Sequence, residues 1–427
     1  MSRPLARLRA AFAQPTARST QIALLGLAGL GLFYFWHLDA NLINDDEGSY
    51  LYAAWRISLG ELPYRDFLTP QLPAFLMPGG WLMRLVGPEV WPLRAFSALF
   101  SLGAGAFTWL TARRLFGSGV AMVAGLAFTL HPLVYYFGRL YRAEPSMLFF
   151  AAAGIFAFAR AAFPDPAPTD APVELPGILP EPMPAPSARR WLLLSGAAFG
   201  LAILCKLFGA LPLAGCGLWL LVDGLRRRRI GPMVVDGLLL SASAALVAGL
   251  PLLWFRSISA NLEQAVLEHH LMQGSQQTLL SELSKTLEFY YQFVDADQGA
   301  LLLFAGIAVA VLAWRRSDRR VMLFGCQLVS LLGFVLLTRD LFIRHLMYLL
   351  PSLATLAGLA LVPLLVQWRQ LAGPARGHDA PSLPVTVLPT ARLGGALAAA
   401  LLAALALPWT YANVVLGLES ETATARL

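Results

Sequence analysis

Three successive carboxylates stand out in the first polar segment of the chain, residues 44–50, which reads NDDEGSY. A helix is expected to follow, because apolar residues recur at helical spacing from Tyr50 onward until Gly60 ends the pattern. A helix cap and the helix dipole account for some of these acids. A carboxylate at this place also has the chemistry of a general base, which takes the proton of an attacking hydroxyl. Asp46 and Glu47 are therefore candidate catalytic residues, and Tyr50 is a candidate substrate-binding residue.

A second polar cluster, residues 139–145 (RLYRAEP), separates two apolar runs. Arg139 and Arg142 fit side chains that reach from a helix end to the membrane surface. The alternative is a functional site in which the arginines bind a phosphate and Glu144 supplies a carboxylate. Both interpretations stay open from the residues alone.

Lys206 interrupts a long apolar stretch, in a chain whose only other lysine is Lys285. A lysine inside a membrane is costly and needs a partner or water, so Lys206 is either a functional residue or a side chain that reaches the surface at a turn. Arg344 and His345 begin a later apolar run, where a guanidinium is able to hold a lipid phosphate. His345 fits an interfacial anchor and a substrate-binding residue equally well.

The segment 64–73 (YRDFLTPQLP) contains two prolines, which fix turns and favour a structural role. Tyr64 and Asp66 are retained as candidate substrate-binding residues. The adjacent His269 and His270 form too weak a pattern to predict a metal site.

The composition excludes a soluble domain. Hydrophobic residues make up 57% of the 427 residues, charged residues only 13%, and the mean hydropathy is +0.62, whereas soluble domains carry about 25% charged residues. The net charge of +7 comes almost entirely from arginines between the apolar runs. These arginines are interpreted as membrane topology signals, and no nucleic-acid partner is expected. The three cysteines lie inside apolar runs and are expected to be buried thiols.

Apolar runs of sufficient length predict about eleven membrane spans, and hence an all-α fold class, a polytopic membrane helix bundle. The stretch 191–225 has arginines at both ends, so it is predicted to turn back near Lys206 and to contribute two short spans. Residues 71–87 are predicted to form a helix at or partly in the membrane, and the first outer loop is predicted to carry amphipathic helices. The remaining spans are placed at residues 20–37, 91–111, 119–136, 145–163, 234–255, 300–314, 321–337, 346–368 and 394–412.

This arrangement places every arginine cluster on one side, which is taken as cytoplasmic together with the N-terminus. A proline-rich loop at residues 164–190 lies on the same side. The opposite, periplasmic side then carries a first catalytic loop at residues 38–70 and a cap loop at residues 256–299, in which residues 279–293 have an amphipathic helical pattern. All of these segments are assigned to a single domain, residues 1–427.

Taken in order, these motifs resemble those of the GT-C superfamily of integral-membrane glycosyltransferases. The most similar branch contains the bacterial relatives of the dolichyl-phosphate-mannose–protein mannosyltransferases, including the aminoarabinose transferase of lipid A. The resemblance covers most of the chain and rests on short motifs at residues 46–50, 112–117, 139–145, 200–206 and 344–351. The chain departs from the aminoarabinose type at residues 68–71 (LTPQ), where those proteins carry a Glu-Lys pair.

The resemblance implies that Asp46 is the catalytic base, that Glu144 is the second acid, and that Lys206 and Arg344 hold the donor phosphate, with Arg139 or Arg142 beside them. The expected reaction is an inverting transfer of a sugar from a polyprenyl phosphate to a hydroxyl of a lipid, glycan or protein. It would take place at the periplasmic face of a bacterial inner membrane.

No cofactor is required by this mechanism, and a divalent cation (Mg or Mn) held by Asp46 and Glu144 is the open alternative. A lipid or solute transporter and a polymerase or ligase of lipid-linked glycans are the competing functions. Transporters often show internal repeats and charged residues in broken helices at mid-membrane. The sequence has no evident repeat, and its carboxylates lie in a predicted outer loop, which favours an enzyme.

Overall fold

The computed structural model describes residues 29–39, 45–163, 186–268, 299–337 and 343–372. These ranges are almost entirely helical. In place of a β-sheet, the described residues have an isolated β-bridge between Pro63 and Phe67. The predicted all-α class is therefore confirmed. After a helical segment at residues 29–35, the elements are α3 (Asp45–Ser58), α4 (Pro73–Val86), α5 (Val90–Phe116), α6 (Ser118–Thr129), α7 (Pro132–Gly138), α8 (Ala143–Ala162), α9 (Pro186–Cys205), η1 (Leu207–Gly209), α10 (Ala210–Arg226), α11 (Ile230–Ile258), η2 (Gln264–Glu268), α14 (Gly299–Trp314), α15 (Arg319–Leu337), η3 (Ile343–Leu349) and α16 (Leu350–Ala372).

Six helical segments in the described residues are long and apolar enough to cross a membrane. They are Val90–Phe116, Ala143–Ala162, Ala188–Cys205, Leu207–Arg226, Ile230–Ile258 and Arg344–Val362. The protein is thus a multi-pass membrane protein. The predicted number of about eleven spans is larger for three reasons. It includes α14 and α15, which do not meet the same criterion, and the runs at 20–37 and 394–412, which lie partly or wholly outside the described residues. It also counts residues 119–136, which the structure divides into two bent helices.

The predicted span at residues 119–136 is bent. Helices α6 and α7 meet at an angle of 55°, so they form a broken span or a loop that returns to the same side. The physical reason is Pro132, which has no backbone N–H to continue the ladder of α6. The side chain of His131 accepts a hydrogen bond from the Leu133 amide and caps the new helix.

The predicted hairpin of residues 191–225 is present. Helix α9 ends at Cys205, Lys206 has an extended backbone with φ −159° and ψ 137°, and η1 leads into α10. A Cβ on Gly209 would come within 2.3 Å of the Ala202 backbone, so only glycine permits this close turn. The turn therefore places Lys206 at one end of the two helices.

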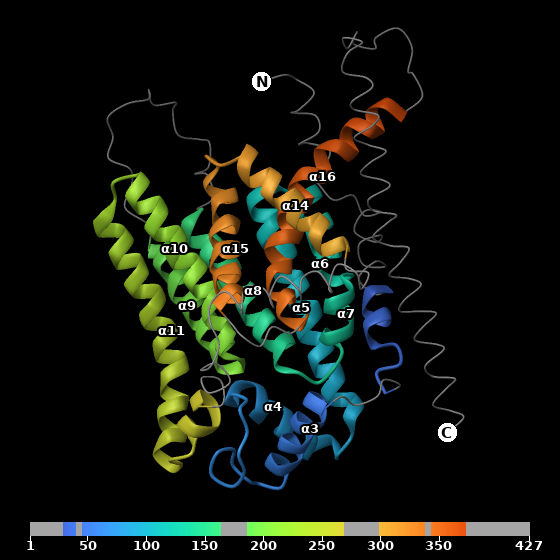
Figure 1. Ribbon diagram of the computed structural model, residues 1–427, viewed down its shortest axis with the longest axis vertical. Coiled ribbons are helices and arrows are strands. Elements are labelled where there is room, and N and C mark those ends of the chain that lie inside the picture. Colours follow the sequence, from blue (N-terminus) through green and yellow to red (C-terminus); the bar gives the residue numbers. More distant parts are fainter. Residues whose placement is uncertain (1–28, 40–44, 164–185, 269–298, 338–342, 373–427) are drawn as a thin grey trace.

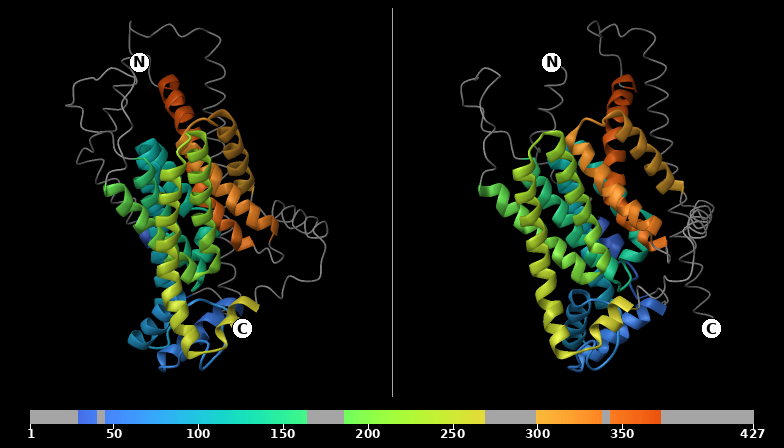
Figure 2. Two further views of the ribbon diagram at one scale, coloured as in Figure 1. Left: turned by 90° about the vertical axis from the view of Figure 1, so that its left-hand side faces the viewer. Right: turned by 60° about the vertical axis from the view of Figure 1, so that its left-hand side comes forward.

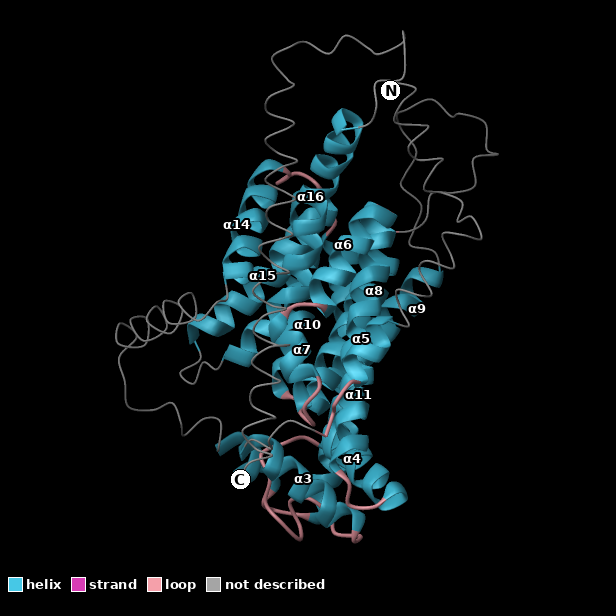
Figure 3. Cartoon of the chain, turned by 90° about the vertical axis from the view of Figure 1, so that its right-hand side faces the viewer, coloured by secondary structure: helices cyan, strands magenta, loops and turns pink. Residues whose placement is uncertain are grey.

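The bundle has two chemically different ends. Arg319 pairs with Asp223 at the end of α10, and Arg320 donates to the carbonyl of Leu115 at the end of α5, so the basic clusters gather at one end. Helices α3 and α4 lie at the opposite end, next to the foot of the long helix α11 (Figure 1; Figure 2). Figure 3 shows the same end from the other side, with loops joining α3 and α4.

Other predicted segments fall in part outside the described residues. Of the proline-rich loop at 164–190, residues 186–190 already belong to α9, and residues 164–185 are outside the description. Of the cap loop at 256–299, the structure describes the end of α11 and the π-helical turn η2, while the amphipathic stretch 279–293 is outside it.

Candidate active site

Five charged side chains meet at the end of the bundle that carries α3 and α4. Oδ2 of Asp46 accepts a hydrogen bond from Nη2 of Arg142 at 2.9 Å and lies 3.3 Å from Nη1 of Arg344. Oε1 of Glu144 lies 2.6 Å from Nζ of Lys206 and 3.4 Å from Nε of Arg344. Oε2 of Glu144 lies 3.2 Å from Nε of Arg142. We call Asp46, Arg142, Glu144, Lys206 and Arg344 the charged cluster.

Each member of the charged cluster lies at the start of a helix or at a break between helices. Asp46 lies in the first turn of α3, and Arg142 is the extended residue that precedes α8. Glu144 lies in the first turn of α8, where the helix dipole favours a carboxylate. Lys206 occupies the break between α9 and η1, and Arg344 lies in the short 3₁₀ segment η3. Helix ends from four parts of the chain therefore build the cluster.

Burial divides the charged cluster into an inner and an outer part. The side chains of Glu144 and Arg142 are 0% and 1% exposed, whereas that of Asp46 is 42% exposed. Both ion pairs of Asp46 within the cluster use Oδ2, so a large part of this carboxylate stays accessible. Three cations against two carboxylates leave one net positive charge. This arrangement can bind a singly charged anion such as a phosphate diester.

Glu47 lies next to the charged cluster but has a different environment. Its side chain is fully buried, and its two oxygens accept hydrogen bonds from Nε and Nη2 of Arg94 at 2.8 and 2.7 Å. The same carboxylate accepts the backbone N–H of Tyr141, and Arg94 also donates to the carbonyl of Leu38. These contacts join α3, α5 and the turn before α8, so Glu47 fixes the position of its neighbour Asp46.

Arg94→Lys is expected to lower the rate of the sugar transfer that the sequence predicts at least tenfold. A lysine cannot reproduce the two parallel hydrogen bonds to Glu47, so Glu47 would no longer fix the position of Asp46. The loss of one buried hydrogen bond to a charged group should also cost about 1.5–3 kcal/mol of stability. Thermal unfolding and initial rates measure both effects. The control is Arg84→Lys on the exposed face of α4, which should behave as the wild type. An Arg94→Lys protein with wild-type rate and stability would contradict the positioning role.

Arg139 points away from the charged cluster. Its guanidinium donates to the carbonyls of Tyr34 and Trp36 and, at 2.6 Å, to the hydroxyl of Tyr135. The hydroxyl of Tyr34 donates in turn to the carbonyl of Thr129. Arg139 therefore anchors the helical segment at residues 29–35 to the bend between α6 and α7, and we leave it out of the proposed phosphate site.

Two aromatic candidates lie against the charged cluster. The ring of Tyr50 is buried, with the guanidinium of Arg142 above it at 5.7 Å, and its hydroxyl accepts from the amide of Gln71 at 3.3 Å. His345 is 4% exposed, and its ring packs against Phe208, whose own ring lies 5.2 Å from Nζ of Lys206. Tyr50 therefore contacts Arg142 directly, whereas His345 reaches Lys206 through the ring of Phe208.

Tyr64 and Asp66 have structural contacts. The Tyr64 backbone has φ +69°, its hydroxyl donates to the carbonyl of Gln71, and its own carbonyl accepts from Ser259 at the end of α11. Asp66 accepts hydrogen bonds from Arg65 and from the amide of Leu62, which together lower the pKa of its carboxyl to about 2. These residues shape the loop between α3 and α4 and tie it to α11.

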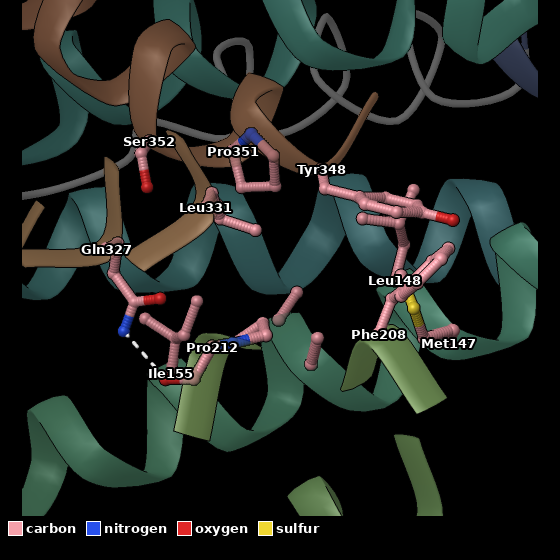
Figure 4. Close-up of a pocket in the computed structure, with 12 residues that line it drawn as sticks. Met147, Leu148, Ile155, Phe208, Pro212, Gln327, Leu331, Tyr348, Pro351 and Ser352 are labelled. Atoms are coloured by element: carbon pink, nitrogen blue, oxygen red, sulfur yellow. Dashed lines mark hydrogen bonds between the residues drawn. The ribbon is translucent and has the colours of Figure 1, made fainter. Parts of the chain in front are cut away.

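A small apolar cavity of about 10 Å³ lies beside the charged cluster. It runs between α8, α10, α15 and α16, and its lining is almost entirely hydrocarbon. Phe208 and Tyr348 form one end, where Phe208 faces both Lys206 and His345. Figure 4 shows Phe208, Tyr348 and Met147 at this end, and Ile155, Pro212 and Gln327 at the other. The site thus combines a cluster of net positive charge with an adjoining hydrocarbon surface.

A divalent cation does not fit the charged cluster as it is built. Asp46 and Glu144 are the two carboxylates that define the cluster, and Oδ2 of Asp46 and both oxygens of Glu144 are already paired with Arg142, Lys206 and Arg344. Three cations at these distances would repel a further positive charge. In the described part of the chain, no group of three His, Cys, Asp or Glu side chains is arranged to hold a metal ion.

The fold and the site define the class of protein: a multi-pass helical membrane protein whose charged cluster adjoins a small apolar cavity. Residues 85–260 match the family model described as dolichyl-phosphate-mannose-protein mannosyltransferase. A comparison with curated proteins gave no match. The resemblance to the GT-C superfamily that the sequence predicts is confirmed by this match together with the similar solved structures.

One similar solved structure is ArnT from Cupriavidus metallidurans bound to undecaprenyl phosphate, with a TM-score of 0.58 and 20% identity over 94% of this chain and 74% of that chain. Another is the oligosaccharyltransferase AglB from Archaeoglobus fulgidus in complex with an inhibitory peptide and a dolichol-phosphate, with a TM-score of 0.54 and 12% identity. That alignment covers 95% of this chain and 56% of the AglB chain. At these identities the likeness is one of fold.

Proposed function

We propose that this protein is a glycosyltransferase that moves a sugar from a polyprenyl phosphate to a hydroxyl acceptor. The observation that carries the proposal is the meeting of three cations and two carboxylates next to an apolar region of the helix bundle. A lipid phosphate has the complementary parts, because its head is an anion and its tail is a hydrocarbon. The solved neighbours that hold undecaprenyl phosphate and a dolichol-phosphate support this choice of donor.

The proposed mechanism assigns one step to each half of the charged cluster. Asp46, the most exposed member, accepts the proton of the acceptor hydroxyl as its oxygen attacks the anomeric carbon. The bond between this carbon and the phosphate oxygen breaks, and its electron pair stays on the phosphate. Lys206, Arg344 and Arg142 stabilise that charge where burial keeps water away. A single displacement of this kind inverts the anomeric configuration.

The other residues have supporting roles in the proposal. Glu144 orients the three cations, Glu47 positions Asp46 through Arg94, and Tyr50 and His345 border the sugar and the phosphate. The acceptor is a lipid, a glycan or a protein. The tethered acceptor peptide of the Archaeoglobus fulgidus oligosaccharyltransferase supports the last of these as one candidate.

The proposed location is a bacterial inner membrane, with the site on the periplasmic side and the N-terminus in the cytoplasm. The support comes from the arginine-rich end of the bundle, because basic residues favour the cytoplasmic side of a membrane. Helices α3 and α4, and with them the charged cluster, lie at the opposite end (Figure 1).

A transporter of lipids or solutes is the competing function. The experiment that separates the two uses proteoliposomes with polyprenyl phosphates that carry a radiolabelled sugar. A transferase moves the label from the lipid fraction to a hydroxyl acceptor and releases polyprenyl phosphate. Movement of the intact labelled lipid across the bilayer without cleavage would contradict our proposal.

Lys206→Met is expected to raise the donor KM roughly tenfold to hundredfold, because a charge-assisted hydrogen bond is worth about 1.5–3 kcal/mol. The acceptor KM should change much less, since Lys206 contacts Glu144 and the ring of Phe208 rather than the exposed carboxylate of Asp46. Steady-state rates at varied donor and acceptor concentrations measure both constants. Arg256→Gln removes an exposed cation near the same end and serves as control. Equal effects of the two substitutions on the donor KM would argue against the phosphate role.

A further inference from the structure

Helix α4 contains three successive residues that disfavour a helix, Pro78, Gly79 and Gly80. A proline inside a helix removes a backbone hydrogen bond, and a glycine is a poorer helix former than alanine. A glycine pair at this place therefore calls for a reason in packing. Both glycines are buried, and each faces a different part of the candidate active site.

Gly79 faces the side chain of Tyr141. A Cβ on Gly79 would lie 1.7 Å from the hydroxyl oxygen of Tyr141 and 2.5 Å from its Cζ. The Tyr141 side chain is fully buried, its ring centre lies 4.8 Å from that of Phe75, and its hydroxyl has no hydrogen-bond partner among the described residues. In a close-packed interior such a ring cannot turn aside without displacing its neighbours. Only glycine permits this approach of α4 to the turn before α8.

Gly80 faces helix α3. A Cβ on Gly80 would lie 2.3 Å from Cγ2 and 2.4 Å from Cβ of Ile57, and 3.2 Å from the carbonyl oxygen of Ala54. The Cβ of Ile57 is fixed to the backbone of α3, so a larger residue at position 80 would push the whole helix away. Asp46 and Glu47 lie in the first turn of this helix and would move with it.

The two contacts meet at the charged cluster. The backbone N–H of Tyr141 donates to Oε1 of Glu47 at 2.8 Å, and the next residue, Arg142, pairs with Asp46. Helix α4, helix α3 and the turn before α8 therefore each contact the other two. A change in the seat of α4 alters the position of α3 and of this turn together.

We propose that Gly79 and Gly80 are positioning residues that set the place of Asp46 relative to the donor phosphate. Lys206 and Arg344 belong to other elements, at the break after α9 and in η3, so they keep the phosphate in place when α3 moves. The inference rests on the proposed function, because it assumes that Asp46 must face a donor held by these cations. A misplacement of about 1 Å is able to lower the rate of a reaction about a hundredfold.

The test measures sugar transfer by Gly79→Ala and Gly80→Ala at varied donor concentrations, with rates referred to the amount of folded protein. The turnover number kcat should fall roughly tenfold to hundredfold in both variants. The donor KM should stay within about threefold of the wild type, because Lys206 and Arg344 remain in place. This split between kcat and KM separates a shift of the base from a loss of donor binding.

The matched control is Gly196→Ala, which introduces an equally crowded methyl group away from the charged cluster. A Cβ on Gly196 would lie 2.3 Å from the carbonyl oxygen of Leu240 in α11. Gly196 lies about 15 Å along the axis of α9 from Lys206. The variant should lose thermal stability and keep the kcat of the wild type.

A second substitution tests whether the effect passes through the tyrosine. Tyr141→Leu removes Oη, Cζ and Cε2, the three atoms nearest to a Cβ on Gly79. In the double variant kcat should be at least tenfold higher than in Gly79→Ala alone. If Gly79→Ala does not fold, recovery of folding in the double variant is the expected result.

A double variant that recovers neither kcat nor folding would overturn the inference. A loss of kcat in Gly196→Ala as large as in Gly79→Ala would overturn it too. Both results would leave the proposed transfer reaction standing. A wild-type protein that transfers no sugar from any polyprenyl phosphate would instead contradict the proposed function, and the inference with it.

Discussion

Asp46→Asn is expected to reduce sugar transfer by roughly 10²–10⁴-fold, the usual contribution of a general base. The asparagine keeps the size of the side chain and an oxygen that can accept from Arg142 and Arg344, so the fold and the donor site should persist. The affinity for polyprenyl phosphate should therefore remain within a few-fold of the wild type. Rates with a labelled donor and binding by calorimetry measure the two quantities separately.

The matched control for this substitution is Asp66→Asn. Asp66 lies in the loop between α3 and α4. Its carboxylate accepts hydrogen bonds from Arg65 and from the backbone amide of Leu62, and neither of these residues belongs to the charged cluster. Its variant should retain most of the activity. A wild-type transfer rate in Asp46→Asn, or an equal loss in both variants, would remove Asp46 from the role of base.

Glu144→Gln is expected to have the largest effect on stability. The carboxylate is fully buried between Lys206, Arg142 and Arg344, and the substitution leaves these three cations without their shared partner. Breaking a buried ion pair by removing one partner costs about 3–5 kcal/mol. Denaturation in detergent should show this loss, and inorganic phosphate should restore part of it, because an anion replaces the missing charge.

A surface pair provides the comparison for Glu144→Gln. Glu61 pairs with Arg56, and both side chains are partly exposed, so Glu61→Gln should cost no more than about 1 kcal/mol. If Glu144→Gln is as stable as Glu61→Gln, the charged cluster does not depend on Glu144 in the way that its geometry requires.

Much of the fold follows from local sequence features. The turn at Lys206 is predictable because arginines at both ends of residues 191–225 require an even number of crossings, and a lone lysine with a nearby glycine marks the place. The break at Pro132 is a feature of the same kind, but the sequence prediction placed a continuous span across it. The hydropathy of residues 118–138 is high on both sides of the proline, so a hydropathy pattern does not reveal the bend of 55°.

The partners of the site residues depend on contacts between distant segments. Arg139 and Arg142 belong to one short turn, yet one bonds to residues 34–36 and the other to Asp46. The spacing of Arg139 and Arg142 in the sequence does not predict which way each side chain points, because the turn before α8 is not a regular helix. Glu47 is a similar case, since its partner Arg94 lies 47 positions away. The signal that could have identified Arg94 is an arginine in the first turn of an apolar helix, on the side without basic clusters.

The arrangement of the charged cluster is what the proposed reaction depends on. Acids from the first two predicted outer loops and cations from later helix breaks come together, as the sequence led us to expect. Gln327, which lines the adjoining cavity, was not expected, because its sequence position in α15 looks like any polar residue in an apolar helix.

The most direct measurement is a cryo-electron microscopy structure of the protein with a polyprenyl phosphate. Our account predicts phosphate density within about 3 Å of Nζ of Lys206 and of the guanidinium groups of Arg344 and Arg142, with the first isoprene unit close to the ring of Phe208. Asp46 should face the open side of the phosphate. A phosphate bound at the arginine-rich end of the bundle, with the charged cluster unchanged, would contradict the account.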